Sequence, residues 1–224
     1  MADPDSRAGT SYQTPAIEAY LRGLYAAETP GMQDALRSAR TAGLPEIQVS
    51  PTDGKILEVL LRMVGARKVV ELGTLAGYSA QWIIRALPPD GHLWTIERDP
   101  KHADVARGVL ERAGLADRAT VLTGTADELL GALEREAPFD AVFIDADKGG
   151  YERYARWALR HLRSGGLVLA DNAYLFGYLA GREPDERESA RSIRAMRAFH
   201  DLLARECDGV VLPTPDGLSV AIKR

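Results

Sequence analysis

Two short acidic segments each follow directly after an apolar run of the chain. The run Ala141–Ile144 leads into Asp145-Ala146-Asp147-Lys148, and the run Leu167–Ala170 leads into Asp171-Asn172. If both runs are parallel strands, the side chains of Asp145, Asp171 and Asn172 can converge at the carboxyl edge of the sheet. Two carboxylates and an amide oxygen form an all-oxygen set, which suits Mg²⁺, Mn²⁺ or Ca²⁺ better than zinc. These residues predict a divalent-metal site, with Mg²⁺ as the first choice, although an aspartate after a strand often only caps the next helix.

Lys148 lies three residues after Asp145, in the loop over the same predicted site. An amine beside a metal-bound hydroxyl can remove its proton when the pKa of the amine is lowered. A lysine in a loop is more often simply solvated. Its place among the acids makes Lys148 the candidate base, with Asp145 beside it as the second catalytic candidate.

A glycine-containing loop follows another apolar run. Lys68–Leu72 leads into Gly73-Thr74-Leu75-Ala76-Gly77-Tyr78-Ser79 and then into a helical pattern. Gly73 and Gly77 allow the backbone to turn tightly and to approach a ligand closely. The N-terminus of the next helix offers N–H groups that suit a carboxylate or a phosphate. The spacing is not the Gly-x-Gly-x-x-Gly of dinucleotide-binding loops, and the alternative is that both glycines only form a turn.

Glu97 follows the next apolar run, His92–Ile96. A carboxylate in this place can accept hydrogen bonds from both hydroxyls of a ribose. The glycine loop and Glu97 together predict a nucleotide-like pocket. The alternative is that Glu97 caps the helix expected after Pro100.

These residues need a scaffold in which strand ends meet. Five apolar runs rich in Val, Ile and Leu are typical of buried strands, and helix-like segments near 77–87, 101–113, 126–136 and 150–163 separate them. A last helix is expected near 184–206, followed by an antiparallel hairpin of Gly209–Pro213 and Leu218–Ile222. The pattern predicts an α/β fold with a doubly wound, mostly parallel, seven-stranded sheet and an antiparallel C-terminal edge strand. The five runs are Lys68–Leu72, His92–Ile96, Ala119–Leu122, Ala141–Ile144 and Leu167–Ala170.

The N-terminal part predicts helices that precede the sheet. Residues 1–11 are rich in Ala, Asp, Gly and Ser and predict a flexible tail. Two helices are expected before Ala42, separated at Thr29-Pro30-Gly31, and a third over about Asp53–Val64. We expect residues 12–224 to form one domain, in which residues 12–64 supply N-terminal helices and a lid.

Composition narrows the partners. The formal net charge is −4, and the basic residues are interleaved with acids, which favours a small-molecule substrate over a nucleic acid. The single cysteine, Cys207, excludes an internal disulfide, so a cytoplasmic location is the natural expectation. No segment has the apolar run of a signal peptide or of a membrane span, so no membrane partner is expected. The four histidines lack metal-like spacing and are expected to be structural.

From about residue 45 to the end, the chain resembles the cation-dependent O-methyltransferases, the group that contains caffeoyl-CoA O-methyltransferase and catechol O-methyltransferase. The segments Asp145–Lys148 and Asp171-Asn172 are together the most specific part of the resemblance. The other matching segments are Val49–Gly54, Val70–Ser79, Thr95–Pro100, Phe139–Ile144, Gly165–Ala170 and Asp216–Leu218.

The resemblance implies a class I methyltransferase with a Rossmann-like fold. Such an enzyme transfers a methyl group from S-adenosylmethionine to one of two vicinal hydroxyls of a small, catechol-type aromatic substrate, assisted by a divalent cation. The resemblance implies that Asp145, Asp171 and Asn172 bind the metal, that Lys148 is the base, and that the chain forms a homodimer. The implied cofactor contacts are the methionine neighbours Glu71, Gly73, Thr74 and Ser79, the lid residue Val49, the ribose ligand Glu97, the adenine contact Ala126, and Asp145 and Asp147.

The chain departs from plant relatives of this family in its substrate region. Phe176 stands where those enzymes have a polar residue, within the aromatic and apolar stretch Ala173–Tyr178. The N-terminal segment shows no clear match to a coenzyme A site. Both departures favour a flatter aromatic substrate over a coenzyme A thioester. The stretch from Tyr174 to Tyr178 either forms one wall for the aromatic ring or only packs its loop down.

Three other functions make different demands on the sequence. A nicotinamide dehydrogenase on the same type of sheet predicts a Gly-x-Gly-x-x-Gly loop, which the chain lacks. An RNA methyltransferase predicts a basic groove. A non-catalytic binding module predicts loss of Lys148 or of the acidic ligands, and all of them are present. All three rank below the metal-assisted methyltransferase.

Overall fold

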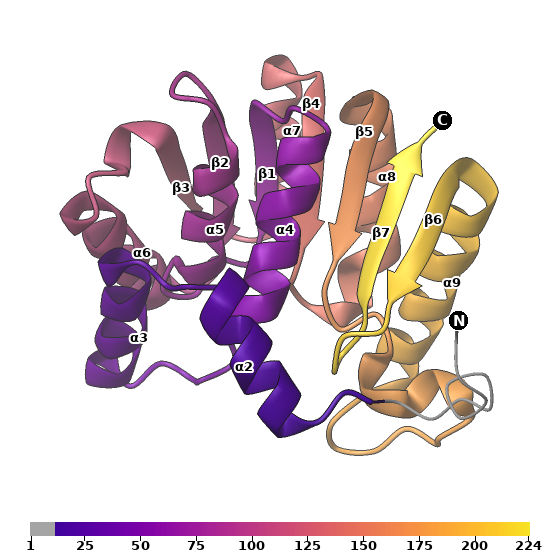
Figure 1. The fold of residues 1–224 in the computed structure, drawn as a ribbon. Helices are drawn as coiled ribbons and strands as arrows, with labels where there is room; N and C mark the ends of the chain where they lie inside the picture. Colours follow the sequence, from indigo (N-terminus) through magenta and orange to yellow (C-terminus); the bar gives the residue numbers. More distant parts are fainter. Residues whose placement is uncertain (1–11) are drawn as a thin grey trace.

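A seven-stranded sheet with helices on both faces lies at the centre of the computed structural model, which describes residues 12–224 (Figure 1). The strand order is β3-β2-β1-β4-β5-β7-β6. The chain starts in the middle at β1 (Lys68–Leu72), winds outward to β3 (Ala119–Thr123), and then returns to place β4 (Phe139–Ile144) on the other side of β1. The predicted doubly wound sheet is confirmed. The predicted tail, residues 1–11, lies outside the described residues.

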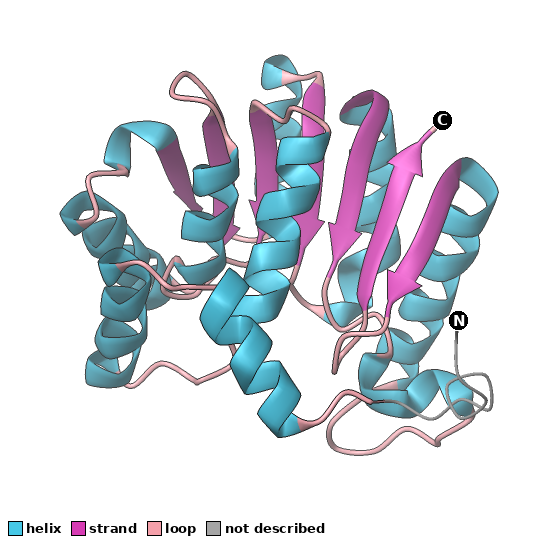
Figure 2. Cartoon of the chain, viewed as in Figure 1, coloured by secondary structure: helices cyan, strands magenta, loops and turns pink. Residues whose placement is uncertain are grey.

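The elements follow the predicted alternation of strands and helices (Figure 2). The remaining strands are β2 (His92–Glu97), β5 (Leu162–Ala170), β6 (Cys207–Leu212) and β7 (Leu218–Lys223). The α-helices are α2 (Pro15–Tyr25), α3 (Pro30–Ala42), α4 (Pro51–Met63), α5 (Tyr78–Ala86), α6 (Pro100–Arg112), α7 (Ala126–Leu133), α8 (Tyr151–His161) and α9 (Ala190–Glu206). Short 3₁₀ turns lie at Ala116–Arg118, Glu134–Glu136, Lys148–Gly150 and Leu175–Ala180.

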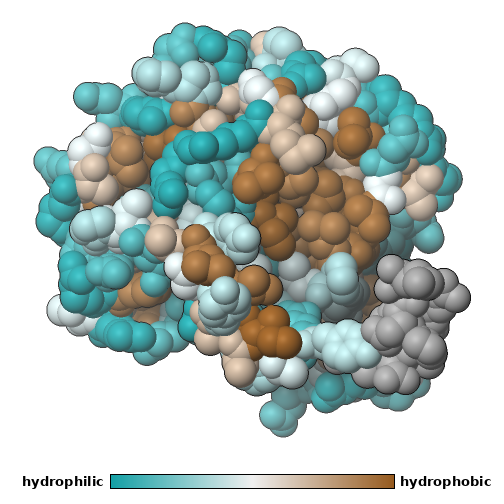
Figure 3. All heavy atoms as spheres, viewed as in Figure 1, coloured by the Kyte–Doolittle hydropathy of each residue, from teal (hydrophilic) through white to brown (hydrophobic). Residues whose placement is uncertain are grey.

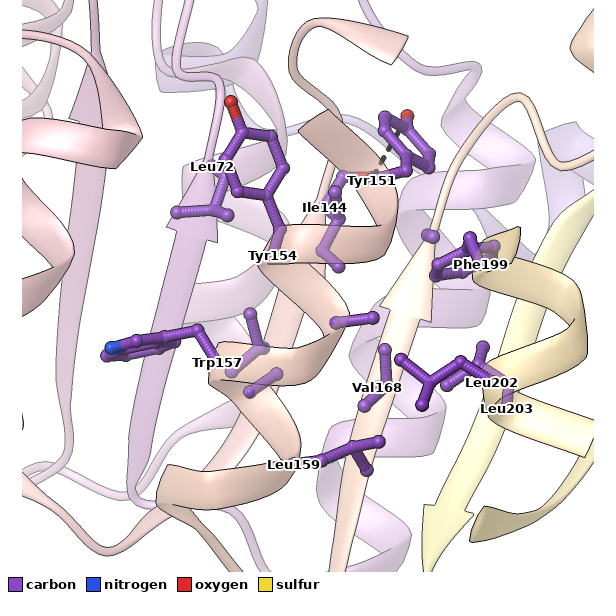
Figure 4. Packing of buried hydrophobic residues seen from close by; sticks show 14 of the residues in the cluster. Leu72, Ile144, Tyr151, Tyr154, Trp157, Leu159, Val168, Phe199, Leu202 and Leu203 are labelled. Carbon is purple, nitrogen blue, oxygen red and sulfur yellow. Dashed lines mark hydrogen bonds between the residues drawn. The ribbon is translucent and has the colours of Figure 1, made fainter. Parts of the chain in front are cut away.

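The central strands are buried on both faces. In β4, Val142 and Ile144 pack into one apolar cluster with α7, α8 and α9, part of which is drawn in Figure 4. Ala141 and Phe143, which alternate with them, pack into a second cluster with α4 and α5. Successive side chains of a strand point to opposite faces, so a strand between two helical layers needs apolar residues at every position. This requirement explains the continuous Val, Ile and Leu runs of the sequence.

The C-terminal hairpin completes the sheet. β7 pairs antiparallel with β5 on one side and with β6 on the other. β7, which runs antiparallel to both of its neighbours, therefore lies one position in from the edge, and β6 is the edge strand. The predicted hairpin is confirmed, with its second strand inserted between β5 and its first strand.

Four helices begin at a proline. The N–H group at the first position of a helix has no partner within the helix, so proline, which lacks this group, fits there. In α4 the residue before the proline, Ser50, accepts a hydrogen bond from the Asp53 backbone N–H, and Asp99 caps α6 in the same way. Helices α4 and α6 start slightly before the positions expected from the sequence, because the proline that was expected to precede each helix is its first residue. None of the helices within residues 12–224 is both long and apolar enough to cross a membrane.

The last helix is shorter than expected. It begins at Ala190, capped by the Ser189 side chain, and the preceding residues from Gly181 form a loop. Asp185 organises this loop, because its carboxylate accepts hydrogen bonds from the Tyr178 hydroxyl and the Arg187 backbone N–H. The expectation of a helix from residue 184 is wrong, since these side-chain bonds replace the first helical turn.

Candidate active site

The register of the sheet aligns the carboxyl ends of four strands. Leu72 of β1 pairs with Ile96 of β2 and with Ile144 of β4, and Ile144 pairs with Ala170 of β5. One position further along, each strand reaches a predicted site residue; these are Gly73, Glu97, Asp145 and Asp171. They lie where the strand order reverses, which is where ligands bind in doubly wound sheets.

Gly73 brings the loop after β1 against the end of β4. Its φ is +97°, and a Cβ at this position would overlap the carbonyl oxygen of Asp145. A larger residue would push the two strand ends apart, so glycine is required. The loop then turns through Leu75, which also has a positive φ of 50°, into Gly77, the residue before α5. No side chain caps the first N–H groups of α5, and Ser79 lies half-buried in its first turn.

Glu97 holds this loop from the neighbouring strand. Its Oε2 accepts hydrogen bonds from the backbone N–H groups of Thr74, at 3.2 Å, and Leu75, at 2.9 Å. Its Oε1 accepts from the Asp99 N–H at 3.0 Å. The side chain that caps α6 is Asp99, so the alternative role of Glu97 as a helix cap is wrong.

Glu71 is a fully buried acid beneath the loop. Its Oε2 accepts a hydrogen bond of 2.6 Å from the Thr95 hydroxyl, whereas its Oε1 makes none with the described residues. Burial raises the pKa of Glu71 to about 8, against the opposing effect of the hydroxyls of Ser79 and Thr95. Nearby charges on Asp145 and Glu97 add to the rise. Glu71 is therefore a buried acid beneath the glycine loop that holds its proton up to a pH of about 8.

The predicted metal-binding residues are also brought together. Asp171 is only 8% exposed, and its pKa is raised to about 7 by burial and, next, by the charge of Asp145. Asn172 adopts a left-handed conformation, with φ of 53°, and its backbone N–H donates to Oδ1 of Asp171 at 2.7 Å. Residues 12–224 contain no cluster of three or more His, Cys, Asp or Glu side chains that could hold a metal. The predicted set contains only two side chains of these types, because its third member, Asn172, is an amide.

Lys148 lies inside this group of acids. Its Nζ donates to Oδ1 of Asp145 at 3.2 Å and to the hydroxyl oxygen of Tyr151 at 2.7 Å. The side chain of Lys148 is 14% exposed, so the expectation of a merely solvated loop lysine is wrong. Its amine has two fixed partners at the strand ends.

Three further predicted cofactor contacts are spread more widely. Val49 is buried just before α4, and Ala126 is buried at the first position of α7. Asp147 is exposed and turns away from Asp145, because its carboxylate accepts a hydrogen bond from the Tyr154 hydroxyl of α8.

A cavity of about 480 Å³ opens beside Asp171 and Asn172. The sequence did not single out several of its lining residues as site residues; these are Arg22, Glu28, Asp53, Tyr78 and Asp216. The Tyr78 hydroxyl donates to Glu28 at 2.6 Å and thereby ties the segment before α3 to the glycine loop. A second cavity of about 580 Å³ lies among α3, α5 and α6 and contains none of the predicted site residues.

The aromatic stretch after Asn172 mainly packs its own loop. Tyr178 is fully buried, and Phe176 packs against the cluster of α8 and α9 while the Arg187 guanidinium lies 3.9 Å from its ring centroid. Tyr174 is 39% exposed. Of this stretch, Tyr174 therefore has the most ring surface free for a ligand.

Comparison with known proteins identifies the family. The chain matches the O-methyltransferase family over residues 24–224. It is 39% identical to the catechol O-methyltransferase of Niastella koreensis, over 92% of this chain and 96% of that protein. It is 38% identical to the catechol O-methyltransferase of Mycobacterium tuberculosis, over 94% of this chain and 96% of that protein. The chain belongs to the O-methyltransferase family. The resemblance inferred from the sequence is confirmed, and a dehydrogenase is ruled out as the family.

Solved structures of O-methyltransferases share the fold. The enzyme from Bacillus cereus, in complex with SAH, is 36% identical, with a TM-score of 0.86 over 93% of this chain and 97% of that one. The tomaymycin-synthesis enzyme TomG from Streptomyces achromogenes, in complex with SAM, is 34% identical, with a TM-score of 0.84 over 93% of this chain and 96% of that one. The class I methyltransferase fold is therefore confirmed.

The raised pKa of Glu71 predicts a pH-dependent stability. Because this pKa is about 8 in the folded chain and 4.5 as a reference, the folded state binds the proton more tightly. The contribution of Glu71 to stability is then lost as the pH rises from about 4.5 to about 8. In Glu71→Gln without cofactor, we expect urea unfolding to give a free energy close to wild type near pH 4.5. At pH 8 we expect the variant to be more stable by ~2 kcal/mol or more, since each pKa unit is worth about 1.4 kcal/mol.

The matched control is Glu111→Gln, which changes an exposed glutamate of α6. Its difference from wild type should be small and the same at both pH values. A Glu71→Gln difference that does not grow with pH would contradict the buried, raised-pKa state of this acid.

Proposed function

We propose that this O-methyltransferase transfers a methyl group from S-adenosylmethionine to one of two vicinal hydroxyls of a small, catechol-type aromatic molecule, assisted by a divalent cation. One observation carries the proposal. Asp145, Asp171, Asn172 and Lys148 meet at the strand ends, beside the glycine loop and the cavity. This arrangement puts an oxygen-only ligand set and an amine next to a nucleotide-like pocket.

The pocket residues fit the proposed cofactor. The Oε1 atom of Glu71 is a buried acceptor without a partner among the described residues, Glu97 presents a carboxylate at the end of β2, and Gly73 lets the loop after β1 lie close against the end of β4. Relatives in complex with SAH and SAM support the same cofactor for this chain. When bound, S-adenosylmethionine supplies the sulfonium methyl group. The proposed contacts are Val49, Glu71, Gly73, Thr74, Ser79, Glu97, Ala126, Asp145 and Asp147, with residues 12–64 as the cover of the pocket.

The donor set fits a hard divalent cation. Burial and, next, the charge of Asp145 raise the pKa of Asp171, and a bound cation would stabilise both carboxylates. Asp145, Asp171 and the Asn172 amide would hold such an ion with three protein ligands, which would leave it able to bind substrate oxygens as well. Mg²⁺ is the proposed ion, with Mn²⁺ or Ca²⁺ as substitutes. Such an ion would lower the pKa of a bound hydroxyl.

The residues of the chain then perform two tasks. Lys148 accepts the proton of the attacking hydroxyl at its Nζ, next to Asp145. The strand ends would hold substrate and cofactor in the orientation that methyl transfer needs, which raises the rate by positioning. Four acids line the cavity, and Arg22 is the one basic residue in its lining; the acids are Glu28, Asp53, Asp171 and Asp216. The phosphates of a coenzyme A thioester would be repelled by this negative charge, so the cavity favours a small substrate without phosphates.

The cofactor assignment predicts a binding defect in Glu97→Gln. We expect calorimetry to show affinity for S-adenosylmethionine weakened by ~1–2 kcal/mol, because a charge-assisted hydrogen bond to the ribose becomes a neutral one. Asp99→Asn changes an acid two residues away that caps α6 instead of holding the loop, and its affinity should match wild type. Equal affinities for Glu97→Gln and wild type would remove Glu97 from the ribose role.

The proposed reaction predicts a strong preference for vicinal diols. With labelled cofactor and Mg²⁺, we expect kcat/KM for a catechol to exceed that for the matching monophenol by about a hundredfold or more, since one ligand oxygen loses orientation and part of the pKa lowering. Activity should vanish with EDTA and return with Mg²⁺ or Mn²⁺. Asp171→Asn should lose activity, whereas Asp208→Asn, at an exposed acid of β6, should keep it.

Each failure has its own meaning. Equal rates for catechol and monophenol would contradict chelation of two oxygens. Full activity after exhaustive chelation would contradict the metal. Absence of methyl transfer to either substrate, with S-adenosylmethionine bound, would contradict the substrate class alone.

We also propose a homodimer through the part of the sheet, at β5, β7 and β6, whose face beside α4 is left open by the described helices. Figure 3 shows apolar side chains gathered over β5, β7 and β6, beside α4. Val210 is 57% exposed, Ile222 is 45% exposed, and Val220 pairs with Val210 in the register. An apolar sheet face of this kind is stable in water when a second copy covers it.

We expect sedimentation velocity to show dimers for wild type and monomers for the double variant Val210→Asp with Ile222→Asp. Tyr20→Asp, on the exposed face of α2, should remain dimeric; a dimer that survives the double change would refute this interface.

A further inference from the structure

Tyr151 is a buried polar residue at the start of α8, three residues after Lys148. Its side chain is fully buried, and its ring packs edge-on against Phe199, with centroids 5.6 Å apart and planes at 73° (Figure 4). Its hydroxyl lies between the ends of β4 and β5. It is 3.0 Å from the Asp171 carbonyl oxygen and 3.4 Å from the Ile144 carbonyl oxygen. The hydroxyl is therefore fixed to the backbone of both strands.

The contacts of the Tyr151 hydroxyl show which partner accepts its proton and which partner donates to its oxygen. A phenol has a single proton to donate, and both carbonyl oxygens can only accept. The proton therefore goes to the backbone, at the shorter distance to Asp171. The lone pair of the oxygen is left for Lys148, whose Nζ donates to it at 2.7 Å. The contact from Lys148 to Tyr151 is thus the shorter of the two that hold this amine, since Asp145 lies at 3.2 Å.

The two anchors of Lys148 differ in what else they do. Asp145 belongs to the proposed metal-binding set, so its oxygens are shared. Among the described residues, the Tyr151 hydroxyl bonds to the carbonyl oxygens at the strand ends and to the Lys148 amine, and it therefore connects the two. A lysine side chain has several rotatable bonds, and an unanchored amine would sample many positions.

From this geometry we propose that Tyr151 is the positioning residue for Lys148, holding its amine at the carboxyl ends of β4 and β5. This inference rests on the proposed function, in which Lys148 is the base. Tyr151 itself does not touch the reacting atoms. It acts by keeping the Lys148 nitrogen within reach of the substrate oxygen, where a small displacement is costly to the rate.

The test is Tyr151→Phe, which keeps the ring against Phe199 and removes only the hydroxyl. We expect kcat for a catechol to fall by about ten- to a hundredfold, with KM and the affinity for S-adenosylmethionine within about twofold of wild type. A loss confined to kcat distinguishes a positioning defect from a general loss of structure. Urea unfolding of the variant shows whether the fold persists.

A second readout needs neither substrate, metal nor cofactor. The full-length protein is treated with limiting acetylating reagent, and acetylation of Lys148 is measured by peptide mass spectrometry relative to exposed Lys101. We expect Lys148 in Tyr151→Phe to react roughly fivefold faster or more, because its amine loses the shorter of the two hydrogen bonds that hold it in place. Tyr178→Phe removes another buried tyrosine hydroxyl and should leave the labelling of Lys148 unchanged.

The two readouts decide the proposal together. Faster labelling with a kcat-specific loss supports it. Unchanged kcat, or a loss of kcat without faster labelling, overturns it. If Lys148→Ala keeps its activity, the proposed base is wrong, whereas the labelling still reports whether Tyr151 holds this amine. If Tyr151→Phe does not fold, 3-fluorotyrosine at position 151 weakens the acceptor oxygen while keeping its contacts, and the same two changes are expected in smaller measure.

Discussion

Carboxyl groups lie close together at the carboxyl edge of the sheet, and the cost of burying their charges, added to their mutual repulsion, is the constraint on which the rest of the site depends. Each acid meets this repulsion differently. Glu97 accepts three backbone N–H groups, and Asp145 faces the Lys148 amine. Glu71 and Asp171 lack such partners in sufficient number, so burial and neighbouring charges raise the pKa of both. The stored repulsion is what a bound cation and cofactor can relieve.

The backbone must be rigid to hold charges that repel. Backbone bonds link the strand ends directly: the Asp145 N–H donates to Leu72 at 2.8 Å, and the Asp171 N–H donates to Ile144 at 3.1 Å. The loops that follow contain left-handed residues that are not glycine, Leu75 and Asn172. Such conformations cost about 1 kcal/mol or more each and persist only when the surrounding structure imposes them. Here the strands on either side, buried on both faces, supply that support.

The strand ends could be predicted because one physical rule makes them visible in the sequence. A strand between two helical layers is apolar throughout, so a charged residue such as Asp145 or Asp171 marks where it leaves the core. The ends of helices were less predictable. Helices were expected to follow Pro51 and Pro100, yet each of these prolines is the first residue of its helix. Near residue 184 the helical pattern was outweighed by hydrogen bonds to the Asp185 carboxylate, which periodicity does not reveal.

The walls of the cavity could not be predicted, because they come from segments far apart in the chain. Glu28 precedes α3 and meets Tyr78 of α5 through one hydrogen bond, a contact with no sequence signature. The N-terminal segment makes further polar contacts of this kind, such as that of the Gln81 amide with the Gly31 carbonyl, beside the buried apolar side chains of α3 and α4. Helix α2 buries none of its side chains. Local opening costs least where little apolar surface is buried, so α2 is the part of the cover that can move away from the cavity while the strand ends keep their geometry.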